Sequence, residues 1–181
     1  MTSNRGVGAG GANTNKNGKY FETLIENKIR DRCSNIINYK THSKFVFDDK
    51  ELTYVPQNKL FKYTGCTGFN KLHGAKHPDQ AFIDENNNII SIVEVKYQQG
   101  SGSAVEKLQT AQAKIFSYQQ TMGDKYKIRY SYGLSNWFSD NAKGEIDYLN
   151  HLGVKYFWVE EESGIDNIIQ WILDDSSQSP Q

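Results

Sequence analysis

The spacing of apolar residues along the chain changes repeatedly between a helical and a strand-like period. Apolar stripes at helical spacing predict helices over residues 18–37, 104–120 and 165–173, and a fourth helix is expected near 140–152. β-Branched and aromatic residues that alternate or cluster predict strands. These strands are expected over 45–47, 52–55, 81–83, 89–96, 126–132 and 154–159. This order predicts an α/β fold with a mixed central β-sheet flanked by helices.

One strand carries charged residues although its apolar sequence predicts that it is buried. The run 89–96 is apolar at most positions, which is typical of a buried central strand, and the polar turn 84–88 joins it to the preceding short strand. Because side chains alternate faces along a strand, Glu94 and Lys96 point the same way. Pairing of the two strands would bring Asp79 beside Glu94. Buried charges are rare unless they are paired or bind a metal, so the pattern predicts a functional site.

The residue types at this site indicate a specific chemistry. Two carboxylates bind a hard divalent cation such as Mg²⁺, for which Mn²⁺ would substitute. A neighbouring lysine can orient a water molecule or stabilise the charge of a phosphorane-like transition state.

The segment Pro78-Asp79, followed after fourteen residues by Glu94-Val95-Lys96, resembles the signature of the PD-(D/E)xK nuclease superfamily. The layout of residues 17–134 is also similar, most of all to small type II restriction endonucleases. The resemblance implies a restriction-endonuclease-like core. It also implies Mg²⁺-dependent, sequence-specific hydrolysis of double-stranded DNA that leaves a 5′-phosphate and a 3′-hydroxyl. A structure-specific, repair or recombination nuclease of the same superfamily is the alternative, as is a nicking or non-cleaving DNA-binding subunit.

The resemblance also implies roles for individual residues. The metal would be bound by the carboxylates of Asp79, Glu94 and Glu22 and by the carbonyl of Val95. Lys96 would complete the catalytic set by generating or orienting hydroxide. Glu22 borders the apolar stripe of the first helix, and Glu26 follows one turn later on the same flank. Both glutamates would equally suit a solvated helix surface.

Candidate DNA contacts surround the signature. Base contacts are expected from the loop after the central strand, at Gln98, Gln99, Ser101 and Ser103. Other contacts, mainly to phosphate, are expected from Lys71, Lys76, His77 and Lys107. The alternative for the loop is a flexible connector in which Ser103 caps the following helix.

Charge and composition limit the partners. Formal net charge is zero, yet residues 1–78 hold 13 Lys and Arg against 6 Asp and Glu, whereas residues 79–181 hold 8 against 15. A basic half would suit a phosphate backbone, unless the halves interleave in the fold. A palindromic duplex target would favour a homodimer.

Domain organisation and location follow from the same sequence. We expect a flexible arm over 1–16, one nuclease domain over 17–173 and a flexible tail over 174–181. No apolar stretch approaches eighteen residues, so no membrane span is expected. The two cysteines lack zinc-ligand spacing and suit a reducing, cytoplasmic compartment.

Overall fold

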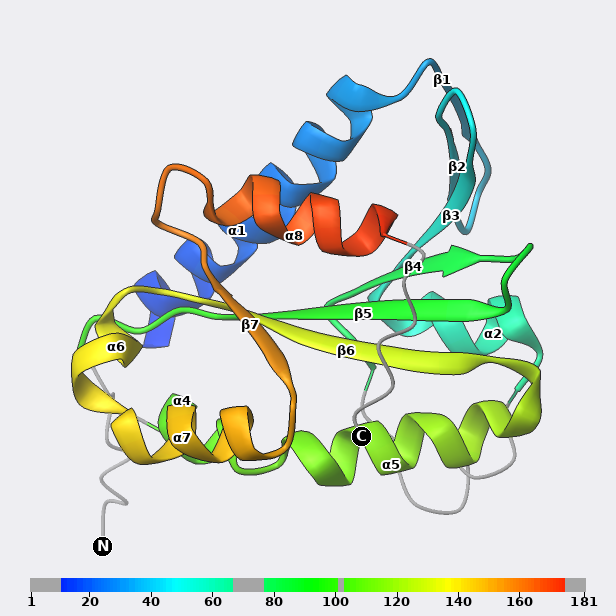
Figure 1. Cartoon of the computed structure of the whole chain (residues 1–181). Helices are drawn as coiled ribbons and strands as arrows, with labels where there is room; N and C mark the ends of the chain where they lie inside the picture. The colour runs from blue at the N-terminus through cyan, green and yellow to red at the C-terminus, as the bar shows by residue number, and fades with distance from the viewer. Residues whose placement is uncertain (1–10, 67–76, 101–102, 175–181) are drawn as a thin grey trace, which may run out of the picture.

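A seven-stranded mixed sheet forms the centre of the molecule (Figure 1). The computed structural model describes residues 11–66, 77–100 and 103–174. In spatial order the strands are β1 (Asn35–Asn38), β2 (Ser43–Val46), β3 (Glu51–Pro56), β4 (Gln80–Asp84), β5 (Ile89–Lys96), β6 (Lys127–Leu134) and β7 (Lys155–Trp158). Neighbours from β1 to β5 pair antiparallel, whereas β5, β6 and β7 run parallel. The expected α/β fold with a mixed sheet is therefore confirmed.

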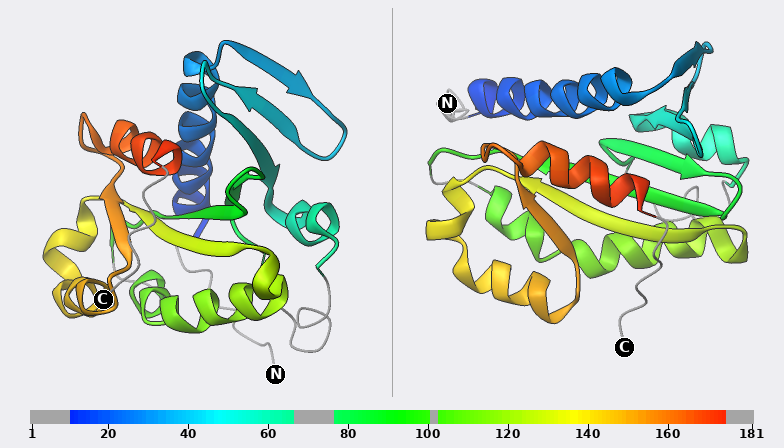
Figure 2. Two further views of the ribbon diagram at one scale, coloured as in Figure 1. Left: turned by 45° about the vertical axis from the view of Figure 1, so that its right-hand side comes forward. Right: turned by 45° about the horizontal axis from the view of Figure 1, so that its top comes forward.

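Helices cover both faces of this sheet, as the two views in Figure 2 show. One layer consists of α1 (Gly11–Arg32) and α8 (Gly164–Leu173). The opposite layer holds α4 (Ala104–Leu108), α5 (Ala111–Met122), α6 (Trp137–Asn141) and α7 (Lys143–His151). Short helical turns, η1 (Gln57–Lys59), α2 (Leu60–Thr64) and η2 (Gly123–Lys125), connect the remaining elements. None of the helices in the described ranges is long and apolar enough to cross a membrane.

Strand β5 separates two apolar cores because its side chains alternate between the faces. Ile90 and Ile92 belong to the core beneath α5, together with Tyr118 of that helix. Val93 and Val95 belong to the core beneath α1 and α8. Glu94 and Lys96 have the parity of Ile90 and Ile92, so the fold directs both charged side chains toward the α5 layer.

Helix boundaries differ from the expected ones at both ends of α1. The helix begins at Gly11, so residues 11–16 of the expected arm have helical backbone, and it ends at Arg32 rather than at residue 37. Residues 35–38 instead pair with β2 as an additional edge strand, and Ser34 N donates to Val46 O at 2.8 Å. The apolar stripe continues past Arg32, which explains why its spacing did not reveal the change.

Two predicted helices are each divided in the structure. The helix expected over 104–120 breaks at Gln109 and Thr110, where the Thr110 hydroxyl donates to Lys107 O at 2.7 Å. Threonine side chains compete with helical hydrogen bonds in this way. The helix expected over 140–152 is divided at Ala142 into α6 and α7. Residues 59–66, expected to be irregular, include α2.

Candidate active site

The β4–β5 hairpin brings the charged residues of the signature together, as expected. Gln80 pairs with Val93, and extension of this register by one residue places Asp79 opposite Glu94. Asp79 Oδ2 accepts hydrogen bonds from Val95 N and from Lys96 Nζ, each at 3.1 Å. The backbone of β5 therefore fixes the Asp79 carboxylate.

Lys96 bridges the two carboxylates of the hairpin. Its Nζ lies 3.1 Å from Asp79 Oδ2, 3.0 Å from Glu94 Oε2 and 3.1 Å from Val95 O. Burial acts to lower the pKa of Lys96, but Glu94 and Asp79 outweigh it and raise the pKa above its usual value. Lys96 is therefore an ammonium ion at neutral pH, which suits orientation and charge stabilisation rather than proton abstraction.

A second lysine, Lys114 of α5, contacts the same carboxylate. Its Nζ donates to Glu94 Oε2. Burial acts to raise the pKa of Glu94, but Lys96 and Lys114 together hold it below the usual value. For Lys114 burial has the larger effect, so its pKa is lowered although Glu94 opposes this. Glu94 thus stays ionised between two buried ammonium groups.

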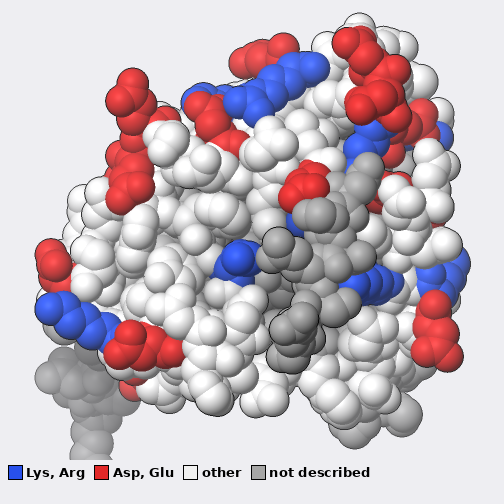
Figure 3. All heavy atoms as spheres, in the orientation of Figure 1, with Lys and Arg blue, Asp and Glu red and all other residues white. Residues whose placement is uncertain are grey.

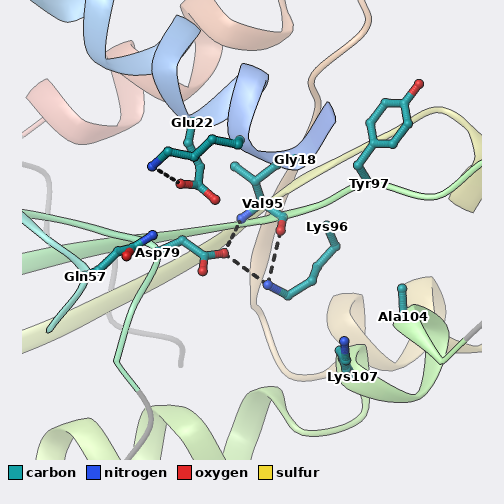
Figure 4. Close-up of a pocket in the computed structure, with 10 residues that line it drawn as sticks. Gly18, Glu22, Gln57, Asp79, Val95, Lys96, Tyr97, Ala104 and Lys107 are labelled. Carbon is teal, nitrogen blue, oxygen red and sulfur yellow. Dashed lines mark hydrogen bonds and ion pairs between the residues drawn. The ribbon is translucent and has the colours of Figure 1, made fainter. Parts of the chain in front are cut away.

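Helix α1 places Glu22 on the other side of Asp79. A cavity of about 330 Å³ lies between α1, β5 and α4, and its lining includes Glu22, Gln57, Asp79, Val95, Lys96 and Lys107 (Figure 4). Gln80 Nε2 donates to Glu22 O at 2.9 Å and fixes the helix against β4. Burial and the charge of Asp79 raise the pKa of Glu22, against the opposing effect of Lys19. Glu26 instead pairs with Arg30 at 2.7 Å, so Glu22 is the glutamate of α1 that faces the cavity.

The oxygens around this cavity suit a hard cation. Among the residues that the structure describes, no three His, Cys, Asp or Glu side chains form a ready metal-binding group. Glu22 and Asp79 nevertheless line the cavity together with Val95, whose carbonyl accepts from Lys96. A divalent cation there would relieve the repulsion that raises the pKa of Glu22. Glu94 is held by lysines, so its carboxylate would join such a cation only if an ammonium withdrew.

The expected DNA contacts fall into three groups. Lys107 is exposed and lines the cavity, and Gln99, Ser103 and His77 are also exposed. Gln98 is buried, and its side-chain amide donates to Gly100 O at 2.6 Å, so it does not present its amide to solvent. Ser103 precedes α4 without a side-chain capping hydrogen bond. Lys71, Lys76 and Ser101 lie outside the described residues.

Surface charge does not follow the division of the sequence into a basic and an acidic half. On the face shown in Figure 3, acidic and basic side chains are interspersed, and neither forms a continuous patch. The two halves interleave because α1 packs beside α8. On this face the linear charge asymmetry therefore gives no basic stripe.

Sequence reasoning missed three residues of the site, Lys19, Lys114 and Gln57. Lys19 lies one turn before Glu22 on α1 and pairs with it at 3.2 Å. Lys114 could have been found, because it occupies a core position of the apolar stripe formed by Ala111, Ile115 and Tyr118. Gln57 gave no such signal. It lies at the cavity immediately after β3, with a left-handed backbone (φ 33°) that is uncommon for a residue other than glycine.

No family model, curated protein or solved structure matches the chain.

Proposed function

We propose that this protein is a Mg²⁺-dependent endonuclease of the type II restriction class, with a restriction-endonuclease-like core. The observation that supports this most directly is the meeting of Asp79, Glu94 and Lys96 at one end of the central hairpin, beside Glu22. Metal-dependent phosphodiester hydrolysis uses hard oxygen ligands to bind the cation and a positively charged group to stabilise the developing negative charge. The carboxylates and the ammonium group of Lys96 are groups of these two kinds. Mn²⁺ would replace Mg²⁺ at the same oxygens.

Each residue has a role that follows from its position. Glu22, Asp79 and the Val95 carbonyl would hold the cation, and Glu94 would join them when one of its lysines releases it. The bound cation would supply Lewis acidity toward a phosphate oxygen and an acidified water. Lys96 would orient the water and stabilise the charge that develops on phosphorus. The water oxygen bonds to phosphorus and releases one proton to solvent. The bond to the 3′ oxygen breaks and that oxygen takes up a proton, leaving a 5′-phosphate and a 3′-hydroxyl.

The proposed substrate is double-stranded DNA. Lys107 and Lys19 line the cavity beside the carboxylates, where they would contact phosphates on either side of the scissile bond. Exposed Gln99 is the remaining described glutamine in the loop after β5 for contact with a base, and its Nε2 donates to the Tyr97 hydroxyl at 2.6 Å, which holds the side chain in place. Cleavage of both strands of a palindromic site would need two such centres, so we propose a homodimer with one site per protomer.

The test is incubation with Mg²⁺ and long duplex DNA, followed by sequencing of the ends. Discrete fragments with a common end sequence are expected from the wild type. Asp79→Asn and Glu94→Gln should give no detectable cutting while DNA binding is retained. Lys96→Met keeps the apolar stem and should lower turnover by at least about a hundredfold.

Asp166→Asn is the matched control for these variants. Asp166 is a carboxylate in ion pairs with Lys28 and Arg32 on the α1–α8 surface, and its loss should leave cleavage unchanged. Wild-type rates in Asp79→Asn or Lys96→Met would refute the proposed active site. Cutting only of branched or flapped DNA would favour the structure-specific or repair nuclease, and binding without cutting would favour the non-cleaving subunit.

A further inference from the structure

Lys114 is buried in a position that has no obvious need for a charge. It lies on the apolar face of α5, and its side chain is only 15% exposed. One turn later on the same helix, Tyr118 packs its ring near that of Tyr130 on β6, with centroids 6.3 Å apart. Burial of an ammonium ion beside these aromatic rings costs free energy unless a negative charge compensates it. Glu94 supplies that counter-charge.

Glu94 already has a cationic partner in Lys96, so Lys114 adds a second charge to one carboxylate. Lys96 donates to Asp79, Val95 and Glu94, and these three acceptors use all three of its N–H bonds. Contact between Lys96 and a phosphate therefore requires release of one of these partners. Lys114 is placed to keep Glu94 compensated when Lys96 releases it.

We infer that Lys114 is a positioning residue of this site, which holds the Glu94 carboxylate and limits the negative charge that the site presents to a divalent cation. This inference rests on the proposed function. Ionised Glu22, Asp79 and Glu94 contribute three negative charges, against which Lys96 and Lys114 set two positive ones. Without Lys114, the summed charge of these five groups changes from −1 to −2. Lys96 would then be the sole compensating ammonium among these residues and would be held on Glu94.

Two measurable effects follow. Lys114→Met and Lys114→Gln should each bind Mn²⁺ at least about tenfold more tightly, because a nearby positive charge in a low-dielectric site has been removed. In cleavage assays kcat should fall by about tenfold or more with little change in KM for DNA, because Lys96 is less available to the reacting phosphate. A merely structural lysine would leave the Mn²⁺ affinity of the folded variants unchanged.

The experiment is isothermal titration of the full chain with Mn²⁺ alone, with folding of each variant checked by circular dichroism. Lys114→Arg keeps the charge and should stay within about threefold of the wild type. Lys28→Met is the matched control, because it removes a lysine from an ion pair with Asp166 outside the cavity. Lys114→Gln retains hydrogen-bonding capacity, so it decides the result if the methionine variant does not fold.

The outcomes separate this inference from the proposed function. Tighter Mn²⁺ binding by the neutral variants alone supports it. Equal affinity in wild type, Lys114→Met and Lys114→Gln overturns the role of Lys114 but leaves metal-dependent cleavage standing. Absence of both Mn²⁺ binding and cleavage in the wild type overturns both.

Discussion

Ionisation of Glu22 is disfavoured in the folded protein. Its side chain is 14% exposed, and burial together with Asp79 raises its pKa. A carboxyl whose pKa is higher in the folded than in the unfolded state binds its proton more tightly when folded. The contribution of Glu22 to the free energy of unfolding therefore decreases as pH rises. The decrease runs from the pKa of Glu22 in the unfolded state, about 4.3, through its higher pKa in the folded state.

Glu22→Gln should accordingly raise the free energy of unfolding at neutral pH in the absence of divalent cations. The gain should disappear below about pH 4, where the glutamate is protonated in both states. Urea unfolding at the two pH values, in the presence of a chelator, measures this.

Glu26→Gln is the control for this prediction, because Glu26 lies one turn away and pairs with Arg30. It should lose a small amount of stability and show no gain at neutral pH. Added Mg²⁺ should stabilise the wild type more than Glu22→Gln. Equal stability of wild type and Glu22→Gln at neutral pH would contradict the electrostatic account of this residue.

Much of the site at residue scale was open to prediction from the sequence. The alternation along β5 was sufficient to group Glu94 with Lys96, and pairing of β5 with the preceding strand was sufficient to bring Asp79 to them. Glu22 and Glu26 could not be separated, since both border the same stripe and only the packing of α1 on β4 selects one. The burial of Gln98 depends on the path of the loop after β5, which local sequence does not determine.

At the scale of elements, the docking of α8 depends on one glycine. A Cβ atom on Gly164 would lie 1.8 Å from the carbonyl oxygen of Trp158, which is a backbone atom that cannot move aside cheaply. The turn between β7 and α8 is closed at this point, where Glu161 N donates to Trp158 O at 3.2 Å. Gly164 therefore allows α8 to pack its isoleucines on Val93 and Val95 of β5.

Gly164→Ala should lower the free energy of unfolding by about 2 kcal/mol or more, because the added methyl group forces the turn or the helix to shift. Gly144→Ala is the control, since a Cβ at Gly144 in α7 meets no atom within 4 Å. That variant should gain about 0.5 kcal/mol from helix propensity. Equal denaturation midpoints for the two alanine variants would argue against this account of the turn.

Helix limits were the least predictable feature at this scale. The apolar period runs unbroken across residues 32–36 and 108–111, but the chain leaves the helix at both places. After Arg32, the chain forms backbone hydrogen bonds with β2 as strand β1. After Leu108, the Thr110 hydroxyl donates a hydrogen bond to the carbonyl of Lys107. Strand pairing and side-chain hydrogen bonds to the backbone end these helices, and neither can be predicted from the spacing of apolar residues.

At the scale of the whole molecule, the cavity is the place where the proposed duplex substrate would bind. Lys107 of α4 lines the cavity, and exposed Gln99 lies in the loop between β5 and α4. The two side chains differ in what they would contribute to binding. A lysine ammonium binds the DNA phosphates whatever the base sequence, whereas a glutamine amide discriminates between base edges.

Lys107→Ala should therefore weaken binding to specific and scrambled duplexes alike and make the salt dependence shallower by about one unit of slope. Gln99→Ala should cost about 1–3 kcal/mol of discrimination at particular base pairs, with an unchanged slope. Equilibrium binding over a salt series, with both duplexes, measures the two effects. Equal losses on both duplexes for Gln99→Ala would remove that residue from base recognition.

The position of the cavity between the two helical layers has a consequence for when this protein becomes active. During synthesis, Glu22, Asp79, Glu94 and Lys96 all leave the ribosome before Lys114, and β5 then still lacks its parallel neighbour β6. The hairpin can pair locally, but α5 is complete only after residue 122 and β6 only after residue 134. For the nuclease proposed above, this order would delay catalytic competence until both α5 and β6 have been synthesised. Under the proposed function, a nascent chain that lacks these elements would not cut the genome of the cell that makes it.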